Sequence, residues 1–323
     1  MEALVAITYR CNAKCHMCNT WQFPSEPAEE IQPADLEGLP KLSFANITGG
    51  EPFLRADIGD FVEVLHSKAD RIVISTNGYL TDRIVALAKR YPDLGFRISL
   101  EGLPAANDEL RGMRNGFDHG LRTLLQLRAL GVHDIGFGIT LSDRNADDVL
   151  ELYELADAMG LEFATAAVHN TFYFHKDDNI ITQKDRVAGN LEELARRLLH
   201  TTQPKKWFRA WFNMGLANYV RGGDRLLPCD MGQDIFLVDP FGRVLPCNAL
   251  DAPMGSLKER SFAEIWDSAE ASAVRARCAQ CDANCWMIGS VAPAMKKHIA
   301  VPAAWIAKAK LSGKLPPVTG LGR

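Results

Sequence analysis

The chain has 323 residues, of which 47% are hydrophobic and 24% charged, and its formal net charge is −4. These values are typical of a folded globular protein with one large or two ordinary domains. The slightly acidic balance argues against nucleic acid or an anionic membrane as a partner. No apolar run reaches the roughly 20 residues that span a bilayer. The start, MEALVAITYRC, lacks the basic region and cleavage site of a signal peptide, so we expect a cytoplasmic protein.

From residue 3 to about residue 170, short β-rich runs alternate with segments of helical spacing. The predicted strands are Leu4–Thr8, Leu42–Thr48, Arg71–Ser75, Gly95–Leu100, Asp134–Leu141 and Glu162–Val168. The predicted helices are Ile58–Ala69, Thr81–Arg90, Gly116–Leu130 and Ala146–Met159. Gly131 and Gly160 are expected to end the last two helices, and Asn145 to cap the fourth. Repeated β-α units predict an α/β fold with a parallel sheet, a partial (β/α)6 TIM barrel with function at the carboxyl ends of its strands.

The second half of the chain is expected to add helices and a cysteine-rich module. Residues 182–222 are predicted to be helical, residues 227–288 to be rich in loops, and residues 289–312 to form a C-terminal helix. The expected domains are therefore a barrel with a helical extension (1–222), a small module (223–290), and a helix with a tail (291–323).

Three cysteines near the start of the chain have a spacing that suits an iron–sulfur cluster. Cys11, Cys15 and Cys18 follow the pattern C-x3-C-x2-C directly after the first predicted strand. They supply three thiolates from one loop, one fewer than a [4Fe–4S] cluster usually takes from its protein, which leaves one iron for another ligand. A structural zinc knuckle and unrelated thiols are the alternative interpretations of this triplet alone.

The remaining cysteines lie together far along the chain. They are Cys229, Cys247, Cys278, Cys281 and Cys285. A disulfide framework is usually denser and fits a secreted chain, whereas C-x2-C spacing elsewhere points to metal binding, so we expect a reducing compartment. The turn Asp239-Pro240-Phe241-Gly242 predicts a hairpin that returns Cys247 towards Cys229.

Short motifs follow the predicted strands in order. Thr48-Gly49-Gly50-Glu51-Pro52 closes the second strand, where the glycines let the backbone approach a ligand closely and Glu51 would present a carboxylate beside that ligand. Ser75-Thr76-Asn77-Gly78 follows the third strand and Ser99-Leu100-Glu101-Gly102 the fourth, with Glu109-Leu110-Arg111-Gly112 behind them. Each motif alone is commonly a plain turn. Their order behind the cysteine loop makes them informative together.

With the cysteine triplet, these motifs resemble the radical SAM superfamily, in which S-adenosylmethionine (SAM) chelates the open iron of the cluster. The resemblance implies that SAM is contacted by Gly49, Gly50, Glu51, Ser75, Asn77, Ser99, Glu101 and Arg111. Glu51 would hold its amino group, and Arg111, with a fork of donors, its carboxylate. Met17 stands where the family often has an aromatic residue, and it is expected to pack against the adenine.

The distant cysteine group resembles the SPASM extension of many radical SAM enzymes, and with five cysteines its shorter twitch form. The resemblance implies one auxiliary [4Fe–4S] cluster, so SAM and two such clusters are the expected cofactors. Its expected ligands are Cys229, Cys247, Cys278 and Cys281. Cys285 would be an alternative ligand or a free thiol that donates a hydrogen atom to a substrate radical. Zinc is the other interpretation of this group.

The resemblance implies an enzyme in which the reduced cluster cleaves SAM to a 5′-deoxyadenosyl radical that abstracts a hydrogen atom from the substrate. Our first hypothesis is dehydrogenation or epimerisation of a small polar metabolite of the sugar or aminocyclitol type, with electrons from a flavodoxin or ferredoxin. The alternatives are modification of a ribosomally made peptide and, outside enzymes, a non-catalytic iron–sulfur or zinc protein. The first strand begins near residue 3, which argues against an N-terminal peptide-recognition domain. The sequence indicates no oligomeric state.

Substrate contacts are expected after the sixth predicted strand, in the run VHNTFYFH. His169 and Tyr173 are the candidates, with Asn170 and His175 beside them. A surface or core role is the commoner one for such histidines. The aromatic residues between Trp207 and Phe212 are expected to pack in the core.

Overall fold

The structure is a computed structural model that describes residues 1–321, and these residues form two compact units. Unit 1 contains Met1–Gly138, Asn170–Asp178 and Met231–Gln280. Unit 2 contains Ile139–His169, Asn179–Asp230 and the chain from Cys281 onward. The domain bounds expected from the sequence stay predictions.

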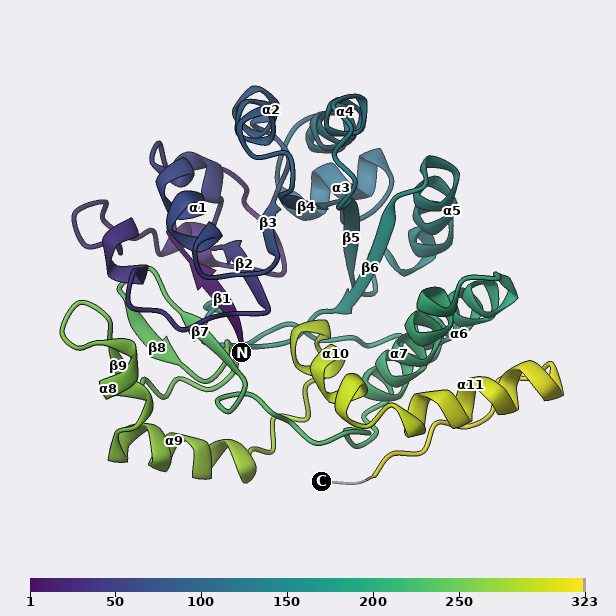
Figure 1. Ribbon diagram of the computed structural model, residues 1–323. Coiled ribbons are helices and arrows are strands. Elements are labelled where there is room, and N and C mark those ends of the chain that lie inside the picture. The colour runs from purple at the N-terminus through teal and green to yellow at the C-terminus, as the bar shows by residue number, and fades with distance from the viewer. Residues whose placement is uncertain (322–323) are drawn as a thin grey trace. The chain divides into compact units, whose positions relative to one another are not determined.

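Unit 1 is built on a sheet of mainly parallel strands. Its strands are β1 (Glu2–Ala6), β2 (Phe44–Thr48), β3 (Ile72–Thr76), β4 (Gly95–Ser99), the first part of β5 (Ile135–Leu141), β7 (Ile235–Val238), β8 (Arg243–Leu245) and β9 (Gly255–Ser256). Its helices are α1 (Ile58–His66), α2 (Thr81–Arg90), α3 (Pro104–Arg111), α4 (Gly116–Ala129), α8 (Phe262–Trp266) and α9 (Ala269–Ala279). The sheet order is β5-β4-β3-β2-β1-β7-β8-β9, parallel from β5 to β7 and antiparallel from β7 to β9. Figure 1 shows α1, α2 and α4 along the outer side of the parallel strands.

The core of unit 1 explains why these strands form. Five neighbouring strands each contribute a side chain with no exposed surface, namely Val5, Ile47, Ile74, Phe96 and Phe137. Parallel strands that are covered on both faces need such runs of β-branched and aromatic residues. The predicted mixed α/β fold with a parallel sheet is therefore confirmed.

The first strand differs in position from its prediction. It covers Glu2–Ala6 rather than Leu4–Thr8. Thr8 leaves the ladder because its carbonyl accepts from the N–H of Gly50 at 2.7 Å and its hydroxyl donates to Glu30. The end of the predicted strand is thus diverted into the site at its carboxyl edge.

The predicted hairpin of the cysteine-rich module is confirmed, and its place in the sheet is new. Strands β7 and β8 are antiparallel, with Leu237 opposite Leu245 and Gly242 at a φ of 83° in the turn. Strand β7 also pairs in parallel with β1, with Leu4 opposite Leu237. A pairing across more than 200 residues leaves no local signal in the sequence.

Unit 2 is mainly helical. It contains the end of β5, with β6 (Glu162–Ala167) beside it, and the helices α5 (Val149–Met159), α6 (Lys184–His200), α7 (Pro204–Val220), α10 (Ile288–Lys297) and α11 (Ala300–Ser312). Helix α5 ends at Gly160 as predicted, in the left-handed conformation. Asn145 does not cap it, because its side chain accepts from the N–H of Ser142 and donates to the carbonyl of Thr140.

Two segments expected to be continuous helices are broken in unit 2. Residues 182–222 form two helices because Pro204 starts α7 and holds Gln203 in an extended conformation. The C-terminal segment also forms two helices. Pro302 has no N–H to donate to the carbonyl of His298, which removes one hydrogen bond that a continuous helix would need at the break. Trp211 and Phe212 are buried, as expected, whereas Trp207 and Phe208 at the start of the same helix are only half-buried.

One ion pair at the amino-terminal ends of the strands makes a prediction for stability. Asp134 accepts from Arg71 at 2.7 Å and from Arg97 at 2.6 Å. Burial alone would raise the pKa of Asp134, but the two arginines lower it to about 2. A carboxyl whose pKa falls on folding stabilises the protein fully at pH values above its pKa in the unfolded chain. This stabilisation is lost as the pH falls through the pKa of the folded state. We expect Asp134→Asn to cost about 1–2 kcal/mol at pH 7, with the difference from wild type closing towards pH 2, in urea unfolding curves. Asp70→Asn, at an exposed acid, should change neither the free energy of unfolding at pH 7 nor its dependence on pH.

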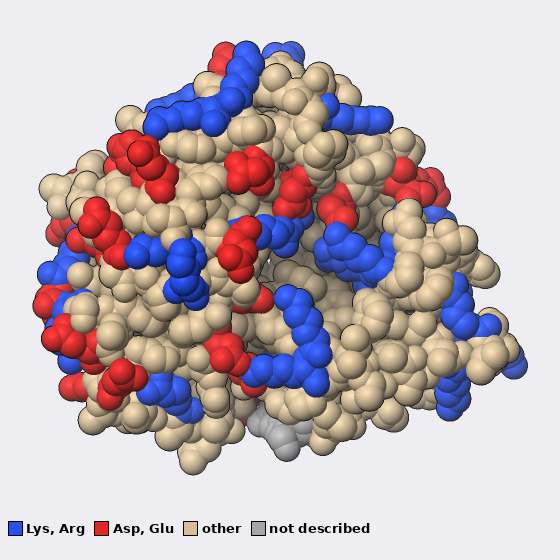
Figure 2. Space-filling model, viewed as in Figure 1, with Lys and Arg blue, Asp and Glu red and all other residues tan. Residues whose placement is uncertain are grey.

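The surface agrees with the small net charge. Acidic and basic side chains lie next to one another over most of the face shown in Figure 2. No helix within residues 1–321 is both long and apolar enough to cross a membrane.

Candidate cofactor site

The three-cysteine loop lies at the carboxyl end of β1 and is tied to the end of α3 and to the segment after β3, both in unit 1. The N–H groups of Lys14 and His16 donate to the carbonyls of Arg111 and Leu110, at 2.9 and 2.8 Å. Asn77, after β3, donates to the Asn12 side chain at 2.7 Å. The motifs that the sequence places at separate strand ends are therefore brought together around Cys11, Cys15 and Cys18.

The paired glycines after β2 serve the approach of one backbone segment to another. A Cβ on Gly49 would lie 2.3 Å from the carbonyl oxygen of Thr8, and one on Gly50 would lie 2.3 Å from that of Arg10. The N–H of Glu51 donates to the carbonyl of Arg10 at 2.9 Å. The close approach of these glycines is thus made to the residues just before Cys11.

Glu51 is fully buried and is held from three directions. Its Oε1 accepts from the Thr76 hydroxyl at 2.7 Å and from the N–H of Phe53 at 3.1 Å, and its Oε2 accepts from the N–H of Asn77 at 2.8 Å. Burial raises the pKa of Glu51, although these hydrogen bonds act against it. A carboxylate has about four acceptor positions. Glu51 can therefore accept one more donor, such as the amino group of SAM.

Arg111 lies at the end of α3, in a helix that the sequence did not predict. Its Nη1 donates to Glu101 at 3.2 Å, in an ion pair whose side chains are 9% and 6% exposed. Its Nε is buried and has no hydrogen-bond partner among the residues that the structure describes. A buried donor without a partner is costly and needs explanation. A carboxylate bound at this side of the guanidinium would satisfy it, which fits the predicted contact with SAM.

The other predicted SAM contacts are spread along the same strand ends. Ser75 exchanges hydrogen bonds with Asn46 on β2, at 3.1 and 3.3 Å. Ser99 ends β4, and Met17 is half-buried in the cysteine loop. Their contacts with SAM stay predictions.

The thiols of this loop suit a cluster in number. No cysteine within the described part of the chain forms a disulfide. Burial raises the pKa of the Cys11 thiol to about 12 and also raises that of Cys15, where Arg111 acts in the opposite direction. No three His, Cys, Asp or Glu side chains within residues 1–321 are grouped as ligands of a single metal ion. A cubane binds its three thiolates through separate iron atoms, and this loop supplies three thiols of that kind.

The five distant cysteines are divided between the units. In unit 1, the turn at Gly232 packs against Pro246, next to Cys247, and a Cβ there would lie 3.5 Å from Cys278 Sγ. Unit 2 contains Cys229, Cys281 and Cys285. There the Arg225 guanidinium donates to the carbonyls of Leu227 and Cys285. Which four of the five bind the second cluster stays a prediction.

The two residues predicted to contact the substrate lie in different units. Tyr173 is in unit 1, where its ring lies edge-on to that of Tyr9 at 5.5 Å and its carbonyl accepts from the Thr20 hydroxyl at 3.4 Å. His169 is in unit 2, where its Nδ1 lies 3.1 Å from the carbonyl of Ala167, and burial lowers its pKa. Their roles towards a substrate stay predictions.

A cavity of about 680 Å³ in unit 1 adjoins the cysteine loop. Its lining residues are Tyr9, Phe23, Pro24, Thr171, Phe172, His175, Lys176, Asp177, Phe241, Arg243 and Asp251. The segment around residue 175 is tied to the loop, because Asn19, next to Cys18, donates to the carbonyls of Phe174 and His175 at 2.8 and 3.0 Å. The sequence indicated His175 in this region but gave no signal for Phe23, Phe241 or Arg243.

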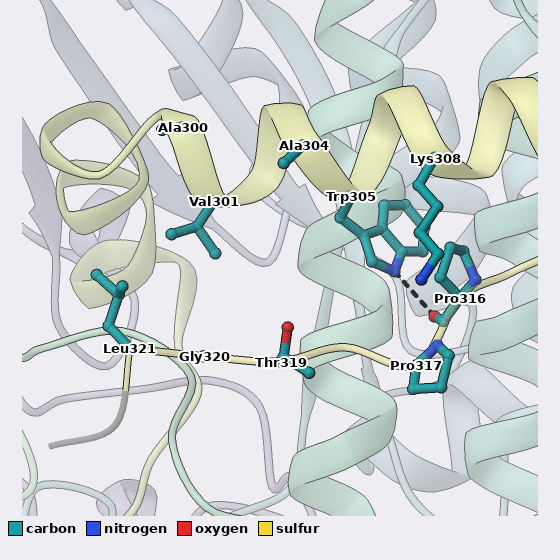
Figure 3. Close-up of a pocket in the computed structure, with 10 residues that line it drawn as sticks. All are labelled: Ala300, Val301, Ala304, Trp305, Lys308, Pro316, Pro317, Thr319, Gly320 and Leu321. Carbon is teal, nitrogen blue, oxygen red and sulfur yellow. Dashed lines mark hydrogen bonds between the residues drawn. The ribbon is translucent and has the colours of Figure 1, made fainter.

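A second cavity, of about 520 Å³, lies in unit 2 between α11 and the tail that follows it. Figure 3 shows Trp305 closing one end, where its Nε1 donates to the carbonyl of Pro316 at 2.9 Å. Its lining is mainly apolar, and Lys308 is the charged residue drawn there. We assign it no role in the chemistry.

Family models match the segment with the three-cysteine loop and the segment with the five distant cysteines. The model of the radical SAM superfamily matches residues 5–156, and that of the SPASM iron–sulfur cluster-binding domain matches residues 229–286. The chain contains a radical SAM domain and a SPASM domain. SAM and two iron–sulfur clusters are accordingly the cofactors of this protein, and their predicted presence is confirmed.

Named relatives of the radical SAM and SPASM domains differ in what they act on. The chain is 32% identical to the Fe-coproporphyrin III synthase of Methanosarcina barkeri over 47% of its own length and 39% of that protein. It is 26% identical to the AdoMet-dependent heme synthase of the same organism over 82% of the chain and 81% of that protein. It is also 26% identical to the sporulation killing factor maturation protein SkfB of Bacillus subtilis, over 90% of the chain and 70% of that protein. The match thus spans well under half of the first of these relatives.

Solved structures agree on the fold of the radical SAM and SPASM domains. Streptococcus suis SuiB matches with a TM-score of 0.63 and 16% identity, over 85% of this chain and 67% of that one. Native anSMEcpe with bound AdoMet matches with a TM-score of 0.60 and 15% identity, over 88% of both chains. At these identities the likeness concerns the fold alone.

The unpartnered Nε makes Arg111→Lys an informative variant of the radical SAM domain. Lysine keeps the positive charge but loses the fork that serves Glu101 and a second carboxylate together. We expect SAM to bind roughly 10- to 100-fold more weakly, as for the loss of a charged hydrogen bond. Equilibrium dialysis with labelled SAM measures this affinity. Arg122→Lys, at an exposed arginine of α4, should bind SAM like wild type, and equal affinity in both variants would contradict the assignment.

Proposed function

We propose that this radical SAM protein is an enzyme that removes a hydrogen atom from a small polar metabolite, giving dehydrogenation or epimerisation. The observation that carries the proposal is the cavity of about 680 Å³ beside the cysteine loop. Bound SAM and its cluster supply the radical chemistry. The chain's own contribution is to hold that pair at the strand ends, to bind the substrate and to exclude water from it.

The size and lining of the cavity support a small substrate. Its volume lies within the roughly 300–1,000 Å³ that is typical of small-molecule sites. Tyr9, Phe23 and Phe241 provide apolar ring faces, against which the C–H face of a sugar or cyclitol ring can pack. A ring of this kind presents the unactivated C–H bonds that radical chemistry requires.

The charges of the cavity also bear on the substrate. Lys176 and Arg243 are balanced by Asp177 and Asp251, and Arg243 lies 3.9 Å from Asp251. A substrate with many carboxylates, such as a porphyrin, would meet two carboxylates here. Mixed charge favours a neutral or zwitterionic ligand, for example one with an amino group and hydroxyls. This favours the metabolite over a tetrapyrrole, the class named in two of the relatives.

A peptide substrate is the second candidate. It is favoured by the similarity to SkfB, which extends over 90% of this chain. A single side chain of a peptide would fill part of the cavity, and the backbone would have to leave through its opening. The two candidates therefore differ in the size of the molecule that gives up the hydrogen atom.

Deuterium transfer to 5′-deoxyadenosine reports directly on the molecule that gives up the hydrogen atom. The protein is reconstituted anaerobically with iron and sulfide, reduced with dithionite, and mixed with SAM and size-fractionated extract of perdeuterated cells. We expect deuterium in 5′-deoxyadenosine with the small-molecule fraction. Deuterium only with the peptide fraction would support the second candidate. Formation of 5′-deoxyadenosine without deuterium from any fraction would contradict both, and no 5′-deoxyadenosine at all would contradict the enzyme.

The fate of the substrate radical is the finer part of the proposal. If Cys285 donates a hydrogen atom, Cys285→Ser should stop epimerisation while deuterium still reaches 5′-deoxyadenosine. If Cys285 is a cluster ligand, the same variant should lose iron. An external flavodoxin or ferredoxin is proposed as the electron donor.

A further inference from the structure

Glu30 is a buried carboxylate at the carboxyl end of β1 that no sequence motif indicated. Its side chain is 1% exposed. Its two oxygens accept from Arg10 through Nε at 3.0 Å and Nη2 at 2.8 Å, from Ser25 at 2.6 Å, from Arg55 at 3.2 Å and from the hydroxyl of Thr8. Every acceptor position of the carboxylate is therefore used. Such a saturated network holds its donors in one arrangement.

The donors are the residues that lead into the first cluster ligand. Thr8 and Arg10 bind Glu30 through their side chains, and the N–H of Tyr9 donates to Ser25 Oγ at 2.8 Å. The N–H of Arg10 donates to the Thr8 hydroxyl at 3.0 Å. Thr8 and Arg10 are thus bonded to Glu30 directly, and Tyr9 is bonded to it through Ser25. The next residue along the chain is Cys11.

The opposite side of this segment is bound by the glycine motif. The N–H groups of Gly50 and Glu51 donate to the carbonyls of Thr8 and Arg10 at 2.7 and 2.9 Å. Glu30 therefore holds the side chains of residues 8–10 while the glycine motif holds their carbonyls. Without the carboxylate, Arg10 would lose its ion-pair partner, and Arg55 would keep only its pair with Asp57.

We propose that Glu30 is a positioning residue for the cluster that binds SAM, acting through Arg10 to hold Cys11 at its ligand position. The neighbouring Glu29 is exposed and has no place in this network. The proposal concerns retention and environment of the cluster and does not depend on which substrate the enzyme uses. It can fail while the proposed function holds, and the reverse is also possible.

The test compares Glu30→Gln with two controls in the reconstituted protein. Glutamine keeps the shape of the side chain but loses its charge. Its NH2 group would also face the N–H and O–H groups that donate to Glu30. Glu29→Gln controls for loss of an acid in the same loop. Asp134→Asn controls for loss of stability, because Asp134 lies at the amino-terminal ends of the strands of the same unit. The readouts are the rate of iron release to a chelator and the change that SAM makes in the EPR signal of the reduced protein.

We expect Glu30→Gln to release the iron of the SAM-binding cluster at least tenfold faster than wild type and to alter the SAM-dependent EPR signal. Both controls should match wild type in these readouts, although Asp134→Asn is less stable. The proposal would be overturned if Glu30→Gln released iron at the wild-type rate, or if Asp134→Asn released iron as fast as Glu30→Gln. If Glu30→Gln does not fold, Arg10→Lys replaces it, since it removes the fork and leaves Glu30 bonded to Ser25, Thr8 and Arg55. Iron release at the wild-type rate in Arg10→Lys would also overturn the proposal.

Discussion

Cys15→Ala should abolish the cleavage of SAM and remove one of the two clusters. The loop supplies three thiolates, and two cannot hold a cubane well enough to survive purification. We expect iron to fall from about eight to about four per chain, because two [4Fe–4S] clusters become one. Production of 5′-deoxyadenosine should fall to background. Iron analysis and an anaerobic assay for 5′-deoxyadenosine measure the two effects.

The matched variant for this experiment removes a cysteine of the other group. Cys278→Ala should also lose about four irons, those of the second cluster, yet SAM should still change the EPR signal of the cluster that remains. In Cys15→Ala, SAM should leave the EPR signal unchanged. Retained SAM cleavage in Cys15→Ala would contradict the ligand assignment. Wild-type protein with about four irons and one zinc would instead give the second site a structural role.

The Cys15 prediction rests on geometry as well as on the motif. Cys15 lies between Lys14 and His16, whose N–H groups are bonded to the end of α3. Shortening the side chain from –CH2–SH to a methyl group leaves these backbone bonds in place. The loop should therefore keep its shape in the variant, so that loss of the cluster reports on the missing ligand.

The parts of the site that the sequence predicted are those with a local signal. The cysteine spacing and the glycine motif each stand beside a strand or turn that the pattern of apolar residues also indicates, whereas Arg111 was indicated by the family resemblance alone. Parallel strands bring their carboxyl ends to one edge. The convergence of Glu51 and Asn77 on the cysteine loop therefore follows once the strands are known.

The parts that were missed depend on contacts between distant segments. Glu30 and Glu29 are identical neighbours in sequence, and only the positions of Arg10 and Arg55 decide which of them is buried. Strand β7 joins β1 from more than 200 residues away. The lining of the cavity combines residues near 9, 23, 172 and 241, which no spacing rule connects. Helix α3 was not predicted because a segment of eight residues is too short to show a clear apolar period.

The role of the glycine motif was predicted in kind but changed in detail. The paired glycines after β2 were expected to let the backbone approach a ligand closely, which stays a prediction; the structure shows a close approach to another backbone segment. The atoms approached are carbonyls of Thr8, Tyr9 and Arg10. The motif therefore shapes the start of the cysteine loop, and any contact of its backbone with SAM comes in addition to this.

Gly50→Ala should displace the cysteine loop and cost the protein its first cluster. The added Cβ would lie 2.3 Å from the carbonyl oxygen of Arg10 and 2.7 Å from that of Tyr9, whereas real Cβ contacts stay beyond about 3 Å. No side-chain rotation relieves the clash, because both neighbours are backbone and the Arg10 carbonyl is bonded to the N–H of Glu51. We expect a loss of about 1–3 kcal/mol in the free energy of unfolding of the metal-free protein, and SAM cleavage close to background.

Gly38→Ala is the control for this variant, since a Cβ at Gly38 meets no atom within 4 Å. It should keep the iron content, the SAM cleavage and the unfolding curve of wild type. The iron lost from Gly50→Ala should be that of the SAM-binding cluster, about four per chain, while the second cluster keeps its EPR signal. Full iron content and wild-type stability in Gly50→Ala would show that the loop can move aside without cost. The tight backbone packing between the glycine motif and the cysteine loop would then not be what holds Cys11 in place.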